Sequence, residues 1–544
     1  MTQQDLEFAV GYATMVELLR ERAFQQTNQR AFTFLADGET ESDWLTYAEF
    51  DRRSRAIAAQ LQALNLQGER ALLLYPPGLD YLTAFFGCLY AGVVAVPAYP
   101  PRNARNTPRI LSMVQDAEAA IALTASSFVE KIQSLLSEHT ALDTLQWLTT
   151  DQLPDDLAND WREPTLTKDT LAFLQYTSGS TGTPKGVMVS HGNLLHNAAT
   201  TYQYMGHSPE SVFVSWLPAY HDMGLIGGIL QPLYGGFPCV LMPPATFLQR
   251  PYRWLKAISD YGATTSGGPN FAYDLCVEKI TPEQRQTLDL SSWKVAFNGA
   301  EPIRAETLER FAETFADCGF QPEAAYPCYG MAEATLMVSG VEATTAPNVQ
   351  TVDAARLEEN QVAIANPPFE QTNVSRWVSC GRSIPDQTVV IVQPDTCLSC
   401  APDQVGEIWV SGSSVGKGYW NRSQETQETF QAYVADTGAG PFLRTGDLGF
   451  LHQGELYITG RAKDLIIVRG RNLYPQDLER SAERSHPSLR AGSGAAFTVA
   501  IAGEEHLVVV QELEFRQKPD TEAVIQAIRQ AVSEEHEIQV YGVV

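Results

Sequence analysis

Short apolar runs alternate with helix-like segments between residues 71 and 149, and this alternation constrains the fold more than any other feature of the chain. The runs "ALLLY" (71–75), "VVAV" (93–96) and "LQWLT" (145–149) are typical of strands, whereas "YLTAFFGCLY" (81–90) and "SFVEKIQSLLSE" (127–138) are typical of helices. Strands joined through helices in this way form right-handed crossovers onto a parallel sheet. The rhythm returns after residue 165, so we expect an α/β fold with two doubly wound subdomains.

The pattern changes near residue 378 to short strands with close turns. "TVVIV" (388–392), "GEIWVSG" (406–412) and "GELYITG" (454–460) predict a small β-rich subdomain. Helical and strand patterns mix again after Gly460, and 544 residues exceed the size of a single hydrophobic core. We therefore expect an N-terminal domain over residues 1–460, with the β-rich part at about 378–460, and a small mobile α+β domain over residues 461–544.

Charge and cysteine usage exclude several classes of protein. The net charge is -26, from 38 basic and 64 acidic side chains, and such a field repels nucleic acid. The eight cysteines are scattered through a long chain, as in reduced cytoplasmic proteins. "CLSC" (397–400) has the spacing of half a zinc site, but no second pair lies nearby, so a hairpin turn is favoured.

The N-terminus lacks the basic and apolar regions of a secretory signal. The uncharged run from Tyr81 to Pro101 is long enough to span a bilayer, but its pattern favours a buried helix followed by a buried strand. We therefore expect a cytoplasmic protein with no integral membrane segment and no nucleic-acid partner.

A loop rich in glycine and hydroxyl residues, "YTSGSTGTPKGV" (176–187), indicates phosphate binding. Gly179, Gly182 and Lys185 do not have the spacing of a Walker loop, and "GVMVS" after the lysine is β-like, with a helix beginning only near Asn193. Backbone N–H groups, hydroxyls and the lysine can nevertheless surround a polyphosphate. A solvated linker is the alternative reading of an isolated loop of this kind.

Four further segments follow in order: "NGAEP" (298–302), "CYGMAEAT" (328–335), "RTGDLG" (444–449) and "GRAKDLIIVRGRN" (460–472). Together with the loop they resemble the motifs of the adenylate-forming enzymes, which include acyl-CoA ligases, amino-acid adenylation domains and luciferases. The resemblance implies that a carboxylate attacks the α-phosphate of ATP and gives an acyl-adenylate and pyrophosphate. Five motifs in register over about 300 residues make it specific.

The resemblance also implies a role for each motif residue. Catalytic roles fall to Lys185, His221, Glu333 and Arg461, with Glu333 as the Mg²⁺ ligand and Lys463 as the hinge before the C-terminal domain. A surface carboxylate is the alternative for Glu333, and a turn-capping residue is the alternative for Asp447. The implied ATP-binding residues are Thr177, Ser178, Gly179, Ser180, Thr181, Gly182, Lys185, Asn298, Gly299, Ala300, Glu301, Cys328, Tyr329, Gly330, Met331, Ala332, Asp447 and Arg461.

The segment "LPAYHDMGLIGG" (217–228) bears on the substrate. Amino-acid adenylation domains carry an aspartate where this chain has His221, because the substrate ammonium needs a counter-charge, so an uncharged tail is favoured here. This segment, "PNFAYDLC" (269–276), "VSCGR" (378–382) and "RGRNLYPQD" (469–477) closely resemble the fatty acyl-AMP ligases. An apolar tunnel for a fatty acid is implied, lined by His221, Met223, Gly224, Ile226, Phe271 and Tyr273.

Residues 341–377 form a plausible insertion with one short helix, "VDAARLEE" (352–359). In fatty acyl-AMP ligases such an insertion restrains the C-terminal domain, so the resemblance implies that CoA is rejected. The implied acceptor is the phosphopantetheine thiol of an acyl carrier protein, with the chain as the loading domain of a polyketide or lipopeptide synthase. Seven basic residues against four acidic ones over residues 461–490 fit an acidic carrier surface, or a solvated helical face.

Three alternatives stay open on the sequence: a fatty acyl-CoA ligase, an amino-acid adenylation domain and a non-catalytic nucleotide or lipid binding module. The chain also ends at Val544 before the lysine segment typical of the family, as in a truncated form or a part of a longer polypeptide. Without that lysine we expect binding of ATP and fatty acid but slow adenylation. The sequence leaves the acid's chain length, the carrier, the oligomeric state and the resting orientation of the C-terminal domain undetermined.

Overall fold

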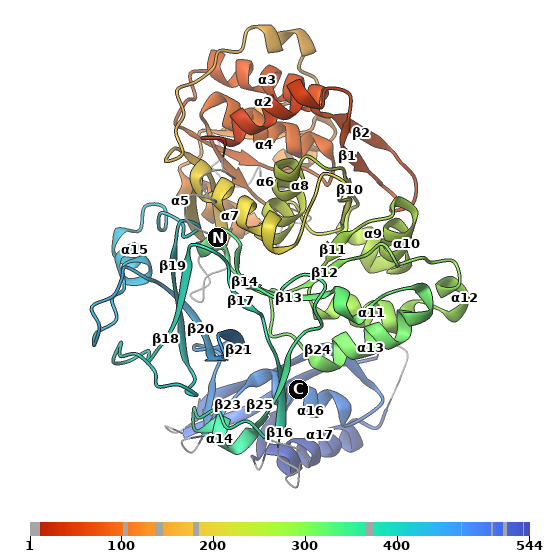
Figure 1. Ribbon diagram of the computed structural model, residues 1–544, viewed down its shortest axis with the longest axis vertical. Coiled ribbons are helices and arrows are strands. Elements are labelled where there is room, and N and C mark those ends of the chain that lie inside the picture. The colour runs from red at the N-terminus through yellow and green to blue at the C-terminus, as the bar shows by residue number, and fades with distance from the viewer. Residues whose placement is uncertain are drawn as a thin grey trace.

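The computed structural model describes residues 11–101, 107–136, 145–177, 184–365, 374–468, 471–501, 504–514, 519–536 and 538–544. Two large sheets with their helices make up the first 340 residues, a four-stranded sheet lies to one side, and the C-terminal domain lies below them in the view of Figure 1. The α/β architecture expected from the sequence is thus confirmed.

The first sheet has six strands in the order β6-β5-β3-β4-β7-β8, parallel except for the β7–β8 pair. Its strands are β3 (Arg70–Leu73), β4 (Val94–Pro97), β5 (Ile121–Thr124), β6 (Gln146–Thr149), β7 (Leu171–Thr177) and β8 (Lys185–Ser190). Its helices are α2 (Met15–Gln25), α3 (Tyr47–Ala63), α4 (Leu79–Ala91), α5 (Thr107–Ala117), α6 (Ser126–Leu136) and the short η3 (Asp155–Asn159). All residues of α4 except Asp80 are buried, and β4 is buried throughout, as expected for the uncharged run.

The second sheet has nine strands in the order β17-β14-β13-β12-β11-β9-β10-β1-β2, with a parallel centre and antiparallel edges. Its strands are β1 (Arg30–Phe34), β2 (Asp43–Thr46), β9 (Phe213–Ser215), β10 (Cys239–Leu241), β11 (Thr265–Gly267), β12 (Val295–Asn298), β13 (Ala325–Gly330), β14 (Met337–Gly340) and β17 (Arg382–Ser383). The helical elements around it are α7 (His191–Tyr204), η4 (Met223–Leu230), α8 (Gln231–Gly235), α9 (Pro244–Gln249), α10 (Tyr252–Tyr261), α11 (Asn270–Lys279), α12 (Pro282–Arg285), α13 (Ala305–Phe315), η5 (Ala316–Cys318), η6 (Pro322–Ala324) and η7 (Ala332–Ala334).

Hydroxyl caps begin two of the early helices. Thr46 and Glu49 form a complete capping box at α3, each satisfying the other's backbone N–H. At α2 only half of the box forms. The Thr14 side chain accepts from the Glu17 N–H, but the Glu17 carboxylate accepts from the Ala13 N–H at 2.8 Å rather than from that of Thr14. The helices then pack their apolar faces against the sheets, which gives the large buried core.

The β-rich subdomain is an antiparallel sheet in the order β18-β19-β20-β21, with one helix beside it. Its elements are β18 (Gln387–Val392), β19 (Gly406–Gly412), α15 (Ser423–Phe430), β20 (Leu443–His452) and β21 (Glu455–Arg461). Cys397 and Cys400 lie in the turn between β18 and β19, where an antiparallel bridge joins Val392 to Ser399, so the hairpin prediction is confirmed. Within the described residues no group of three or more His, Cys, Asp or Glu side chains is arranged to hold a metal ion.

The segment predicted as an insertion contains more strand than expected. β15 (Val349–Asp353) pairs with β16 (Val374–Val378), and between them lies α14 (Ala354–Glu358). The expected helix over 352–359 is therefore too long, because Val352 and Asp353 belong to β15 and Asp353 caps α14. Residues 366–373 lie outside the described part of the chain.

The C-terminal domain is a three-stranded sheet with two helices and a hairpin. Its elements are β22 (Ile466–Val468), β23 (Arg471–Leu473), α16 (Pro475–Arg484), β24 (Leu489–Ile501), β25 (Glu504–Leu513), α17 (Thr521–His536) and β26 (Val540–Val543). Leu478, Ala482, Ile528 and Val532 bury the two helices against the sheet. No helix in the described ranges is long and apolar enough to cross a membrane.

Candidate active site

A cavity of about 650 Å³ opens where several strands end. Gly299 and Ala300 follow β12, Met331 follows β13, and His221 lies in the loop after β9, so these residues meet at the carboxyl edge of the nine-stranded sheet. Thr177 and Lys185 come from the antiparallel pair β7–β8 of the other sheet. The carboxyl edge of a mostly parallel sheet is where such folds bind ligands.

Most of the residues implied by the motifs lie in the wall of this cavity. They are Thr177, Lys185, His221, Met223, Gly299, Ala300, Cys328, Tyr329, Gly330, Met331, Ala332, Glu333, Arg461 and Lys463. Five of the predicted ATP-binding residues lie outside the described residues, namely Ser178, Gly179, Ser180, Thr181 and Gly182. Asn298 stands behind the wall, fully buried, where its amide donates to the side-chain oxygen of Asn270 at 3.0 Å.

A second cavity of about 580 Å³ lies between the N-terminal and C-terminal domains. Glu301 and Asp447 line this space rather than the first cavity. Ala300, Tyr329, Arg461 and Lys463 line both cavities, so the two spaces are neighbours across these side chains. Lys463 follows β21, in the link between the four-stranded sheet and the C-terminal domain, which is the position that its hinge prediction requires.

Two non-glycine residues of the site have left-handed backbone conformations. Ala300, two residues after the end of β12, has φ 72°. Thr335 has φ 69° directly after η7, where its hydroxyl donates to the Ser414 carbonyl at 2.6 Å. Such conformations cost free energy for residues with a Cβ, and they persist where the surrounding structure holds them. Both turns therefore fix the backbone that surrounds the cavity.

Asp447 is almost fully buried and has two partners. The Tyr329 hydroxyl donates to Oδ2 at 2.7 Å, and Arg461 Nε lies 3.0 Å from Oδ1. Burial raises the pKa of this carboxyl, while the Arg461 guanidinium and the tyrosine hydroxyl act in the opposite direction. Both oxygens of this carboxylate thus have a partner, and the side chain lines the second cavity.

Glu333 is the second buried carboxylate. The Tyr419 hydroxyl donates to its Oε1 at 2.9 Å, and burial raises the pKa of the carboxyl. The Glu333 carbonyl accepts from the Gly416 N–H at 2.8 Å, so η7 is tied to the segment after β19. The surface position considered for Glu333 is therefore wrong.

Lys185 forms an ion pair with Glu425 of α15, and its ammonium lies 5.1 Å from the centre of the Tyr419 ring. The lysine holds the pKa of the Glu425 carboxyl below its usual range. Arg422 contacts Glu425 at 3.1 Å and Asp116 at 2.7 Å, which connects α15 to α5. No sequence motif singled out Glu425 as the partner of Lys185, because it comes from a helix about 240 residues away from the lysine.

His221 lies beside Asp222, with Nδ1 and Oδ1 2.5 Å apart. The hydrogen bond to this carboxylate raises the pKa of the imidazole. Asp222 Oδ1 also accepts from the Met223 N–H at 2.7 Å and caps η4, a π-helical segment over Met223–Leu230. Segments of this kind are frequent at functional sites.

Four of the residues predicted to line an apolar tunnel do not line the cavity. A Cβ at Gly224 would lie 2.0 Å from the Pro218 carbonyl oxygen, so this position serves close packing. Ile226 of η4 is buried in the core. Tyr273 is buried among Trp254, Trp293 and Phe311 and donates to the Phe297 carbonyl at 2.8 Å. Phe271, 44% exposed, lies at the surface against Trp216.

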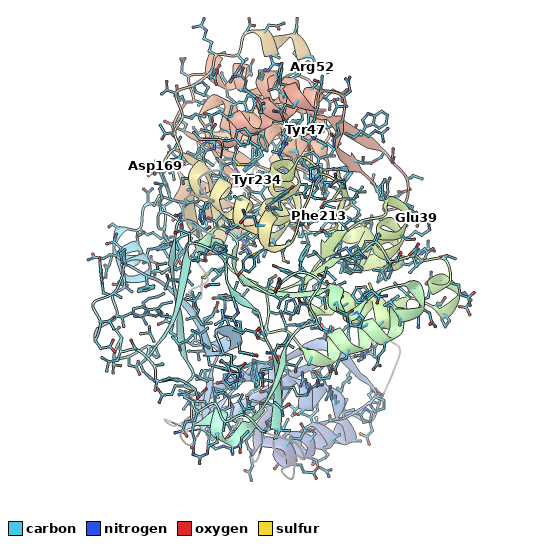
Figure 2. All side chains as sticks on the ribbon, viewed as in Figure 1. Glu39, Tyr47, Arg52, Asp169, Phe213 and Tyr234 are labelled. Carbon is cyan, nitrogen blue, oxygen red and sulfur yellow. The ribbon has the colours of Figure 1, made fainter. Side chains whose placement is uncertain are left out.

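Other side chains form the apolar part of the wall. They are Met205, Phe213, Phe297, Leu336 and Met337, which come from the end of α7, from β9 and β12, and from the start of β14. Figure 2 shows Phe213 in the middle of the molecule, whereas Glu39 and Asp169 lie at its edge. The sequence offered no motif for these residues, which look like ordinary core positions until the fold brings them to one cavity.

We compared the chain with known protein families, curated proteins and solved structures. Residues 19–420 match the family described as AMP-binding enzyme. The chain belongs to this family. It is 49% identical over 539 residues to the medium-chain-fatty-acid–[acyl-carrier-protein] ligase JamA of Moorena producens, covering 98% of this chain and 91% of that one.

Two further matches define the branch of the family. The chain is 36% identical to the medium-chain-fatty-acid–[acyl-carrier-protein] ligase TtuA of Teredinibacter turnerae, covering 92% of this chain and 84% of that one. The structure resembles that of a fatty acyl-adenylate ligase from L. pneumophila in complex with acyl adenylate and pyrophosphate, with a TM-score of 0.81, 42% identity and coverage of 98% and 92%. The chain is thus an AMP-binding enzyme of the fatty acyl-AMP ligase branch, and ATP is its nucleotide.

Proposed function

We propose that this AMP-binding enzyme joins a fatty acid to the α-phosphate of ATP and then passes the acyl group to the thiol of an acyl carrier protein. In the second step a thioester bond forms, the bond between the acyl carbon and the phosphate oxygen breaks, and AMP leaves. The observation that carries the proposal is a single cavity with two different ends. One end has Lys185, Glu333 and Arg461, which suit a nucleotide, and the other is lined by Met205, Phe213 and Met337. The high identity to carrier-protein ligases over nearly the whole chain supports the same acceptor.

In the first step a carboxylate oxygen attacks the α-phosphorus, a phosphorus–oxygen bond forms, and the bond to the pyrophosphate oxygen breaks. Such a reaction is accelerated by alignment of the reacting atoms and by neutralising charge on the phosphates. Lys185 would face the leaving phosphates, Asp447 would accept the ribose hydroxyls, and Arg461 would contact the ribose or the phosphates. His221, beside Asp222, would lie next to the acyl carboxylate.

Glu333 fits a role in binding Mg²⁺. This ion prefers hard oxygen ligands and is usually held by one or two carboxylates together with substrate phosphates. Glu333 supplies one such carboxylate at the cavity wall, and its tyrosine partner leaves it anchored on one oxygen. When bound with ATP, the ion would neutralise charge on the phosphate oxygens.

An amino-acid substrate fits the cavity less well. The one carboxylate beside His221, that of Asp222, already accepts hydrogen bonds from the imidazole and from the Met223 N–H. A substrate ammonium would have to compete for it, whereas a fatty acid brings no cation to this position. The apolar wall beyond Met223 then favours a hydrocarbon tail.

The acceptor is proposed from the contacts of the segment 341–377. Arg471 of β23 binds Glu358 of α14 through two hydrogen bonds of 2.6 and 2.9 Å, and Asn472 donates to the Glu358 carbonyl. Trp377 packs edge-on against Tyr474, with ring centres 5.8 Å apart. In Figure 1, α14 and β16 reach down beside β23. These contacts support restraint of the C-terminal domain and, with it, transfer to a carrier protein, such as the carrier domain of a polyketide or lipopeptide synthase, rather than to CoA.

The first step is tested by incubating the protein with ATP, Mg²⁺ and either fatty acids or amino acids, and measuring pyrophosphate release together with acyl-adenylate by mass spectrometry. We expect fatty-acid-dependent release, reduced about 100-fold in Lys185→Met because a cation facing the phosphates is lost. Lys417→Met is the matched control. Lys417 forms an ion pair with Asp169 at 2.8 Å and does not line the cavity. Release that depends on amino acids, or ATP binding without any acyl-adenylate, would contradict the proposal.

A further inference from the structure

The apolar part of the cavity extends along the strands of the nine-stranded sheet. Phe213 is the first residue of β9 and pairs in register with Thr265, which pairs with Val295 at the start of β12. Gly299, in the same cavity wall, follows the end of β12. Val295 and Asn298 are three residue steps apart along β12, so the cavity reaches about 10 Å from the carboxyl edge toward the amino edge of the sheet.

Three side chains line the cavity toward the amino edge. Met205 and Thr201 come from the last turns of α7, and Gln231 is the first residue of α8. Thr201 and Gln231 are buried, and the Thr201 hydroxyl points to the sulfur of Met337 at 3.7 Å. Because α7 leads through residues 205–212 into β9, this group lies beside Phe213 and away from the nucleotide end.

Gln231 does not stand alone in this wall. Its side-chain nitrogen lies 3.3 Å from Nδ1 of His207, and Nε2 of His207 lies 3.1 Å from the Thr265 hydroxyl. An amide nitrogen only donates, so Nδ1 accepts and the ring proton must be on Nε2, directed at Thr265. Burial lowers the pKa of His207 to about 4, so the ring is neutral.

The packing around His207 makes the network rigid. The ring packs edge-on against Tyr202 and Phe237, with ring centres 6.0 and 5.1 Å apart. Moving Gln231 aside would leave Nδ1 of His207 without a donor in a buried place, which is costly. A hydrocarbon tail that reaches Gln231 therefore meets a polar group that cannot yield easily, in contrast to the methionines along the rest of the wall.

We propose that Gln231, held by His207, is the end wall of the acyl cavity and sets the longest fatty acid that the enzyme activates efficiently. This inference rests on the proposed function and adds the residue that determines specificity. Thr201 is the second member of the same wall. The chemistry selected is a hydrocarbon tail that ends at Gln231, and longer tails are excluded by the wall rather than by the nucleotide end.

The test is a series of saturated fatty acids of increasing length, with kcat/KM measured by pyrophosphate release. For the wild type we expect kcat/KM to fall by at least about tenfold at the first acid that is too long. In Gln231→Ala the fall should move to longer acids, each newly accepted methylene adding about fourfold, the usual effect of burying one methylene. In Thr201→Leu, which adds volume to the wall, the fall in kcat/KM should move to shorter acids.

Gln203→Ala is the matched control, because Gln203 is an exposed glutamine of the same helix α7 that does not line the cavity. A gain of activity with longer acids cannot come from partial unfolding, so the Gln231→Ala result is informative even if that variant is less stable. An unchanged length profile in both wall variants, with the wild type active, would overturn the end wall. Absence of acyl-adenylate from the wild type with every acid would instead contradict the proposed function.

Discussion

Two buried carboxylates, Asp447 and Glu333, each accept a hydrogen bond from a tyrosine hydroxyl, from Tyr329 and Tyr419 respectively. A hydrogen bond to a carboxylate favours its charged form, whereas burial favours the neutral form. In both residues burial dominates and raises the pKa. The tyrosines therefore limit how far burial removes the ionised state, which the proposed binding of Mg²⁺ and of the ribose requires.

This balance predicts the pH dependence of Tyr419→Phe. Removing the hydroxyl raises the pKa of Glu333 further, so the carboxylate becomes protonated at a higher pH as the solution is acidified. The acid limb of the kcat profile should therefore move upward, by about one pH unit, which is the usual size of one hydrogen bond to a charged group. The measurement is fatty-acid-dependent pyrophosphate release as a function of pH.

Tyr433→Phe is the control for this substitution, since Tyr433 is an exposed tyrosine of the same subdomain. An acid limb that stays in place in Tyr419→Phe, with activity otherwise intact, would show that Glu333 does not act in its ionised form.

At the residue scale, the sequence identified the motif residues but not the groups that hold them. Glu425 and Tyr419 carry no signal of their own, because an isolated Glu or Tyr in a sequence has many roles. Phe271 and Tyr273 lie in a segment that resembles the fatty acyl-AMP ligases, and the resemblance implies that they line the tunnel. The helix α11 turns Tyr273 into the core and leaves Phe271 at the surface, which the pattern alone does not reveal.

Among the elements, α16 joins the C-terminal domain to the rest of the molecule. Its Arg480 contacts Glu306 of α13 at 2.8 Å, and its Asp477, which is partly buried, lies in the first turn of the helix. Burial raises the pKa of Asp477 to about 6; Arg480 and Arg304 act against this shift, while Glu306 and Glu358 add to it. Ionising Asp477 therefore costs free energy in the folded state.

The sign of the resulting pH effect follows from linkage. Because the folded pKa is above the unfolded one, Asp477 contributes stability that is fully present below the unfolded value and is lost as pH rises through about 6. Asp477→Asn should thus gain stability over the wild type, of order 2 kcal/mol, at neutral pH and lose this advantage on acidification. Thermal unfolding and amide exchange of α16 at several pH values measure the difference.

Glu534→Gln serves as the comparison, because Glu534 is an exposed carboxylate on α17 of the same domain. If the wild type and Asp477→Asn show parallel pH dependence between about pH 5 and pH 8, the carboxyl of Asp477 titrates normally and the burial argument is wrong.

Element by element, the periodicity of the sequence predicted the doubly wound part well and the segment 341–377 poorly. The runs around β3, α4, β4 and β6 are strongly apolar, so their type is evident. The strands β15 and β16 mix polar residues with valines, as in "VQTVD", and they are separated by about twenty residues. Pairing of such strands depends on distant packing, which local pattern does not encode.

For the whole molecule, three observations agree: a cavity with a nucleotide end and an apolar end, contacts between the C-terminal domain and the segment 341–377, and high identity to carrier-protein ligases. The motifs were enough to assign the family and the reaction. They did not give the end of the acyl cavity, because Gln231, His207 and Thr201 meet only after the chain folds. The cytoplasmic location and the mobility of the C-terminal domain stay predictions.

The proposed transfer to a carrier protein rather than to CoA is tested by a competition between the two acceptors. The enzyme is given ATP, Mg²⁺ and a fatty acid that it activates, with CoA and a holo acyl carrier protein present together, and both products are measured by mass spectrometry. We expect the acylated carrier protein as the main product and little acyl-CoA. Acyl-CoA as the main product would contradict this expectation and would show that the contacts between Glu358 and Arg471 do not restrict the acceptor.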